Sequence, residues 1–105
     1  MDISVNWDGY NRFSKKTLDD VSAENKSKVS LQLSRLLNFL AIVVVNLKKK
    51  DMARVNVLVW DFLDISSEME KAGIAKPVIS SFFIGAKEDV SVLTELVKWY
   101  EDKAK

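Results

Sequence analysis

Two runs of apolar residues at helical spacing, separated by a short charged segment, constrain the fold more than any other feature of the sequence. In the first run the apolar positions recur at intervals of four and three, at Val29, Leu33, Leu36, Leu40, Val43 and Leu47. In the second run they recur at intervals of three and four, at Val55, Leu58, Phe62, Ile65, Met69 and Ala72. This spacing places each set on one side of an α-helix, so the sequence predicts two long helices joined by a turn.

The charged segment between the two runs resembles the end of one helix followed by the start of another. The lysines at 48–50 favour the C-terminal end of a helix, where the helix dipole is negative. Asp51 is a good N-cap and is expected to accept a hydrogen bond from the backbone of residue 53 or 54. The sequence therefore predicts a helical hairpin with helices over residues 22–50 and 51–72.

The same region also supports a β-sheet interpretation, because β-branched residues are abundant in it. The segments AIVVV and VNVLVW suit strands, ISVNW alternates, and PVISSFFI would supply a fourth strand. That interpretation gives an α+β fold in the order β-α-β-β-α-β with a C-terminal helix. We favour the helical interpretation, because its two apolar runs account for more residues.

The rest of the chain is expected to complete an all-α, single-domain bundle of four to five helices with the hairpin at its centre. Residues 1–13 are expected to fold back as an apolar lid, although Trp7, Tyr10 and Phe13 also fit one side of a helical turn. A further turn is expected at 14–20. A short helix is expected over residues 77–84, beginning at Pro77. A longer helix is expected over residues 87–103, with one apolar half. That half contains Val90, Val92, Leu93, Leu96, Val97, Trp99 and Tyr100.

The chain contains no Cys and no His, which excludes several kinds of chemistry. Disulfides, Cys- or His-based zinc sites and nucleophiles activated by a His base are all ruled out. The carboxylates of Asp61, Asp64 and Glu68 share one helical face, where they would suit a divalent ion or neighbouring lysines. No second acidic cluster supports a metal site, and no Gly-rich phosphate loop is present. We therefore expect no enzymatic activity, cofactor, metal or small-molecule substrate.

The apolar stretch of the first long helix is too short to span a bilayer without interruption. Residues 39–47 provide about half of the roughly 20 apolar residues that a spanning helix needs. The first residues lack the basic and apolar regions of a signal peptide. The formal net charge is +1, so no general attraction to nucleic acid or anionic membranes is indicated. We expect a cytoplasmic protein that does not enter a membrane.

The two long helices contain more large apolar residues than a chain of 105 residues readily buries. Exposed apolar patches of this kind mark interfaces, so we expect a homodimer, or docking to another protein. The candidate interface residues lie outside the two main runs: Ile42, Val45, Val57, Trp60 and Leu63. Trp60 is the expected anchor. The alternative without an interface is that Ile42 and Val45 pack under the 77–84 helix and Trp60 under the N-terminal lid.

The densest basic cluster suggests a second function class. Lys48, Lys49, Lys50 and Arg54 would contact phosphates if the protein were a nucleic-acid-binding accessory protein. No aromatic residue for base stacking lies inside the cluster. We therefore favour solubility and compensation of the helix dipole as the roles of these residues.

Overall fold

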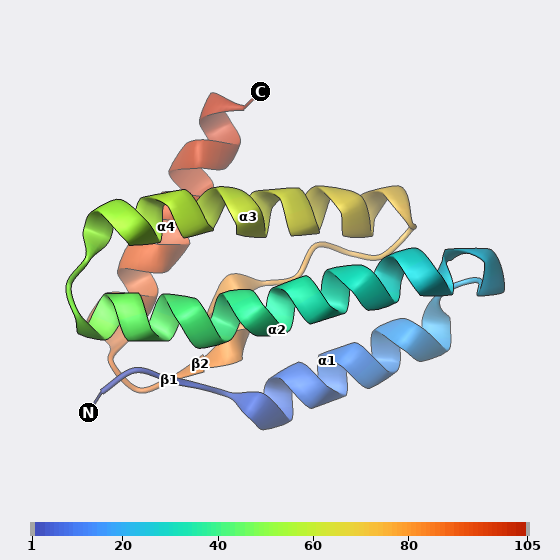
Figure 1. The fold of residues 1–105 in the computed structure, drawn as a ribbon, viewed down its shortest axis with the longest axis horizontal. Coiled ribbons are helices and arrows are strands. Elements are labelled where there is room, and N and C mark those ends of the chain that lie inside the picture. Colours follow the sequence, from blue (N-terminus) through green and yellow to red (C-terminus); the bar gives the residue numbers. More distant parts are fainter. Residues whose placement is uncertain (1, 105) are drawn as a thin grey trace.

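The two apolar runs form two antiparallel helices that lie side by side along the long axis of the molecule (Figure 1). The protein is represented by a computed structural model that describes residues 2–104. In it, α2 spans Lys26–Lys48 and α3 spans Met52–Lys71. The predicted all-α fold with a central helical hairpin is confirmed. The terminal residues of the predicted 1–105 domain, Met1 and Lys105, lie outside the described part.

The hairpin is held together by the predicted apolar positions. Every residue of the first run is buried, and in the second run only Ala72 is half-buried. The rings of Phe39 and Phe62 meet between the helices with centroids 5.3 Å apart. The β-sheet interpretation is wrong for AIVVV and VNVLVW, because both segments are helical and buried along one side. The 3.6-residue period outweighed the strand preference of their β-branched side chains.

The turn between α2 and α3 has the predicted cap. Asp51 accepts a hydrogen bond from the backbone N–H of Arg54 at 3.1 Å, which confirms its role as the N-cap of α3. Lys50 adopts a left-handed backbone conformation with φ of 60°. At the other end of α3, Gly73 has a φ of 82°, the conformation that commonly ends a helix.

The N-terminal segment differs from the expected lid, because most of it is helical. Helix α1 spans Trp7–Asp20 and begins at Asn6, whose side chain accepts a hydrogen bond from the N–H of Gly9 at 3.0 Å. Its residue Tyr10 is buried in the core. A 3₁₀ turn, η1 at Ala23–Asn25, then leads into α2, so the α-helix begins later than the predicted residue 22.

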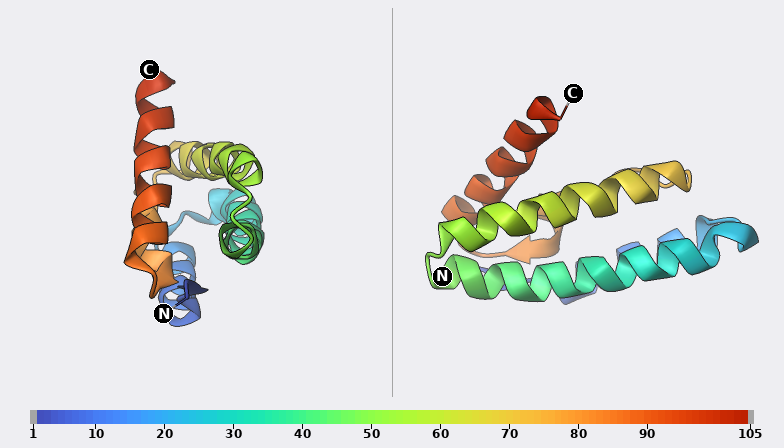
Figure 2. Two further views of the ribbon diagram at one scale, coloured as in Figure 1. Left: turned by 90° about the vertical axis from the view of Figure 1, so that its left-hand side faces the viewer. Right: turned by 45° about the horizontal axis from the view of Figure 1, so that its top comes forward.

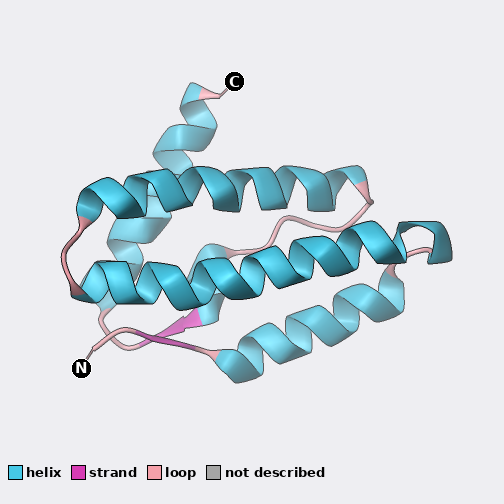
Figure 3. Cartoon of the chain, viewed as in Figure 1, coloured by secondary structure: helices cyan, strands magenta, loops and turns pink. Residues whose placement is uncertain are grey.

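The predicted helix over residues 77–84 is wrong. The chain instead forms a 3₁₀ turn, η2 at Ile79–Phe82, and a short strand, β2 at Phe83–Ile84. Strand β2 pairs antiparallel with β1 at Ser4–Val5 (Figure 3). A helix of eight residues is marginal by itself, and pairing with a distant strand offers the backbone an alternative set of hydrogen bonds.

Helix α4 spans Lys87–Lys103, the residues that the amphipathic pattern predicted, and crosses behind α3 (Figure 2). Helix α1 runs beside α2, and the molecule measures 40 × 32 × 17 Å. Within residues 2–104, no element covers the side of α2 and α3 that faces the viewer in Figure 1. We call this side the open face.

Candidate interaction surface

The open face has a shallow groove between α2 and α3. The groove has a volume of about 230 Å³. It is lined by Arg35, Asn38, Phe39 and Ile42 from α2 and by Leu58, Asp61 and Ile65 from α3. Because residues seven apart lie on the same side of a helix, Arg54 continues the side of Asp61 on α3. The open face therefore combines apolar side chains with both signs of charge.

The predicted interface residues are exposed to different degrees. Ile42 and Val45 on α2 are 42% and 47% exposed, and Val57 and Trp60 on α3 are 57% and 47% exposed. Leu63 is half-buried against the core. The alternative in which Ile42 and Val45 pack under residues 77–84, and Trp60 under the N-terminal segment, is wrong, because these side chains keep much of their surface.

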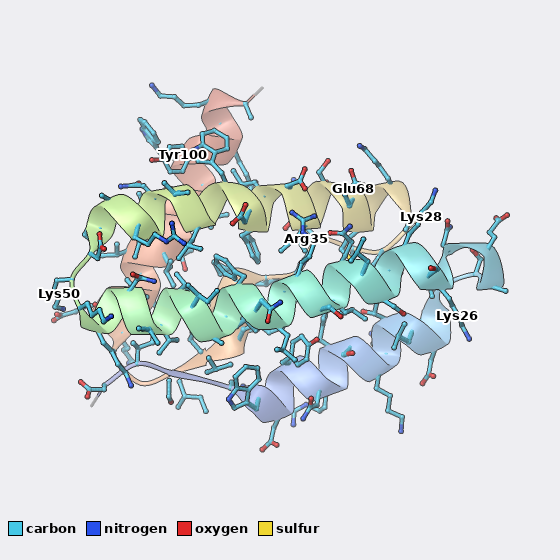
Figure 4. All side chains as sticks on the ribbon, in the orientation of Figure 1. Lys26, Lys28, Arg35, Lys50, Glu68 and Tyr100 are labelled. Atoms are coloured by element: carbon cyan, nitrogen blue, oxygen red, sulfur yellow. The ribbon has the colours of Figure 1, made fainter. Side chains whose placement is uncertain are left out.

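Trp60 lies at the edge of α3 that adjoins α4, where it begins an aromatic cluster. Its ring centroid is 4.6 Å from that of Tyr100, which in turn is 4.8 Å from that of Trp99 (Figure 4 labels Tyr100). The Tyr100 hydroxyl donates a hydrogen bond to Asn56 Oδ1 at 2.6 Å, and the Lys103 ammonium lies 4.4 Å from the Trp99 ring centre. These contacts hold Trp60 in one orientation while half of its surface stays open.

The apolar half of α4 is less buried than the sequence pattern indicated. Leu93 and Val97 are buried, whereas Val92 is 42% and Trp99 is 52% exposed. The second half of α4 extends past the edge of α3, so there is less neighbouring structure to cover it (Figure 1). The wheel pattern alone gives no signal for where a neighbouring helix stops, so the exposure of Trp99 was missed.

The four predicted nucleic-acid contacts are all exposed but do not form one purely basic surface. Lys50 Nζ lies 3.7 Å from Asp89 Oδ1, and the surface hollow around Lys50 also includes Asp2 and Glu88. Arg54 lies on the side of α3 that carries Asp61. Acidic groups therefore adjoin the basic cluster on two sides.

The acidic ridge on α3 is mostly paired with cations. Asp64 Oδ2 lies 2.9 Å from Arg35 Nη1, an ion pair that bridges the two helices, and Glu68 Oε1 accepts a hydrogen bond from Lys71 at 3.0 Å (Figure 4 labels Arg35 and Glu68). Among residues 2–104, no group of three or more acidic side chains is arranged to hold a metal ion. Asp61 is different, since it makes no ion pair within the described structure.

A second hollow, between α3 and α4, has a volume of about 240 Å³. Its polar groups include Lys76, whose ammonium lies 3.5 Å from Glu70 and 3.8 Å from Glu101. The buried hydroxyl of Ser66 has no hydrogen-bond partner in the described structure. Glu70 on α3 and Glu101 on α4 therefore share one lysine.

Residues 23–48 are long and apolar enough to cross a membrane by length and composition, and 44% of their most apolar 18-residue stretch is buried inside the fold. In this structure they form η1 and the central helix α2, which packs against α3, α1 and β1. The core helix of a soluble protein has the same length and composition. Length and composition therefore do not distinguish a membrane-spanning helix from the core helix of a soluble protein.

No protein-family model, curated protein or solved structure shows significant similarity to this chain. The function has to be inferred from the chemistry of the surface itself, because a helical fold alone does not indicate one.

Proposed function

We propose that the protein has no catalytic activity and works in the cytoplasm through protein–protein contact, self-associating through the open face and the adjoining edge of α3. The observation that carries this proposal is the exposure of Ile42, Val45, Val57 and Trp60, between 42% and 57%, on the two helices at the centre of the fold. Exposed apolar surface that is concentrated in one region and bordered by charges is typical of interaction sites.

Burial of this exposed apolar surface would contribute favourable free energy to association. Full burial of one such side chain is worth roughly 1.5–3 kcal/mol relative to full exposure, and these side chains are about half exposed. A two-fold dimer uses the same patch on both subunits, so each contribution counts twice. The aromatic contacts of Trp60 reduce the ordering cost of binding, since its ring is already held against Tyr100.

Sedimentation equilibrium at micromolar concentration tests self-association. The wild-type protein should give a mass near twice 11.9 kDa, and Trp60→Ala should shift the mass toward that of the monomer. Trp7→Ala is the matched control, because Trp7 is 42% exposed, close to the 47% of Trp60, but lies on α1, away from the open face. A monomeric wild type at all concentrations tested would contradict self-association.

The exposure of Lys48, Lys49 and Arg54 favours nucleic-acid binding as a second candidate function. It is the weaker candidate, because acidic groups adjoin the cluster and none of its members is aromatic. Gel-shift assays with random DNA and RNA at low salt separate the two functions. A shift that is lost when Lys48, Lys49 and Arg54 are replaced by Gln would support nucleic-acid binding.

A further inference from the structure

Two opposite charges on the open face have no partner in the described structure. Arg54 and Asp61 are exposed, and neither makes an ion pair within residues 2–104. They lie seven residues apart on the same side of α3, so about 10 Å of helix separates them. Between them lies Val57, the most exposed of the predicted interface residues.

Arg54 and Asp61 lie at equal distances along α3 on either side of the apolar centre of the open face. The midpoint between Arg54 and Asp61 falls between Val57 and Leu58. The register of the antiparallel helices, given by the Phe39–Phe62 contact and the Arg35–Asp64 ion pair, puts Ile42 of α2 level with Leu58. A two-fold axis at this level, perpendicular to the helices, would place Arg54 of each copy opposite Asp61 of the other. It would also bring Val57 and Ile42 close to their own symmetry mates.

We propose that the open face binds a second copy of this chain with the two α3 helices antiparallel, and that the two Arg54–Asp61 pairs across the interface determine this partner and its orientation. The inference rests on the proposed self-association and adds to it the residues that give specificity. Isologous contacts of this kind are the commonest basis of soluble homodimers.

A second copy satisfies both charges, whereas other occupants satisfy only one. A nucleic acid or an acidic peptide on the open face would pair with Arg54 but would leave Asp61 facing like charge. A basic peptide would pair with Asp61 and leave Arg54 unpaired. A charge that loses water without gaining a partner is costly, so a partner that carries both signs in reverse order is favoured.

Charge reversal followed by mixing tests the proposal. In Arg54→Glu each interface contact becomes Glu against Asp61, and in Asp61→Arg each becomes Arg54 against Arg. Each variant alone should dimerise at least about tenfold more weakly than the wild type at low salt. An equimolar mixture of the two should dimerise with near wild-type affinity, because both contacts then join opposite charges.

Both variants are expected to fold. Arg54→Glu places a Glu three residues after the N-cap Asp51, in the arrangement of a capping box and at the positive end of the helix dipole. Arg is a good helix former at position 61. Circular dichroism confirms that each variant is helical, and Arg12→Glu and Asp19→Lys on α1 serve as charge-matched controls that should dimerise as the wild type does.

The outcomes separate this inference from the proposal on which it rests. A dimer whose affinity is unchanged in both reversed variants overturns the antiparallel arrangement while self-association stands, as does a mixture no tighter than either variant. A wild type that stays monomeric overturns both.

Disulfide cross-linking gives an independent test, because the chain contains no natural cysteine. Val57→Cys should form a covalent dimer under mild oxidation, since an axis beside Val57 brings the two Cα atoms within the roughly 7 Å that a disulfide allows. Val78→Cys is the control, as Val78 is 65% exposed in the segment before η2. No cross-link at position 57 in a protein that dimerises would overturn the proposed axis.

Discussion

The phenol of Tyr10 on α1 donates a hydrogen bond to the backbone carbonyl of Leu33 on α2, across 2.8 Å of buried interface. Burial raises the pKa of Tyr10 above its ordinary value of about 10, and a hydrogen bond with the side chain of Ser14 opposes this in part. The packing of α1 on α2 therefore depends on a neutral phenol. The sequence places Tyr10 only in an apolar pattern, with no sign of this polar contact.

The stability of the protein should fall as the pH rises above about 10, partly through Tyr10. Because the folded pKa is raised, the unfolded chain loses the proton first, so the stabilisation is complete below the unfolded pKa and is lost as the pH rises through the folded pKa. Tyr10→Phe should lower the free energy of unfolding by about 1 kcal/mol at neutral pH. Urea titrations from pH 7 to 11 should show a smaller decline in stability for Tyr10→Phe than for the wild type. Parallel curves for the two proteins would exclude ionisation of Tyr10 as a source of the decline.

Gly9→Ala should destabilise the protein, although Ala ordinarily stabilises a helix relative to Gly. A Cβ at position 9 would lie 2.7 Å from Asn6 Nδ2 and 3.2 Å from the carbonyl oxygen of Ser81. The Asn6 side chain would have to move away from the N–H that it caps, and loss of such a cap costs about 1 kcal/mol. Lys15→Ala, at an exposed position of the same helix, is the control. An increase in the denaturation midpoint of Gly9→Ala would show that the cap tolerates the methyl group.

Asp51→Ala should lower the free energy of unfolding by about 1 kcal/mol, because the N–H of Arg54 loses its acceptor. Asp51→Asn should retain most of the stability, since its side-chain oxygen accepts the same hydrogen bond. Chemical denaturation measures both variants. Equal stability of Asp51→Ala and the wild type would show that the Asp51 cap does not stabilise the turn.

Lys50→Gly should stabilise the protein by roughly 1 kcal/mol, because a residue with a side chain pays a steric cost at φ of 60° that Gly avoids. The exposed ion pair with Asp89 is worth little against this gain. Lys49→Gly, at φ of −78°, should give no such gain. A lower denaturation midpoint for Lys50→Gly than for the wild type would contradict the steric argument.

The parts of the fold that depend on local sequence were predictable, and the parts that depend on distant contacts were not. The hairpin follows from side-chain period, and its turn from the capping chemistry of Asp51, both of which are visible within a few residues. Strand β1 exists because Ser4 pairs with Ile84, and α1 begins where the Asn6 N–H donates to the Phe82 carbonyl at 2.8 Å. The segments ISVNW and PVISSFFI each suit a strand, but neither carries a local signal that it pairs with the other.

The candidate surface was also predictable only in part, because some of its features depend on distant contacts. When a helix has a second apolar group outside its buried side, that group is expected to be exposed. Ile42 and Val57 are exposed in this way. The contact of Trp60 with Tyr100 depends on where α4 crosses α3, which no helical wheel indicates. The lack of any ion pair at Arg54 and Asp61 likewise becomes apparent only when all neighbours are in place.

The pairing of β1 with β2 has a consequence for the order in which the chain folds. Residues of α2 and α3 are close in sequence, so their hairpin closes a short loop and forms early. The strand pair joins Val5 to Phe83 and encloses nearly the whole chain, so its entropic cost is best met after the hairpin exists. During synthesis, Val5 therefore has no strand partner until Phe83 has left the ribosome. Until then its apolar side chain is available to chaperones or to other nascent chains.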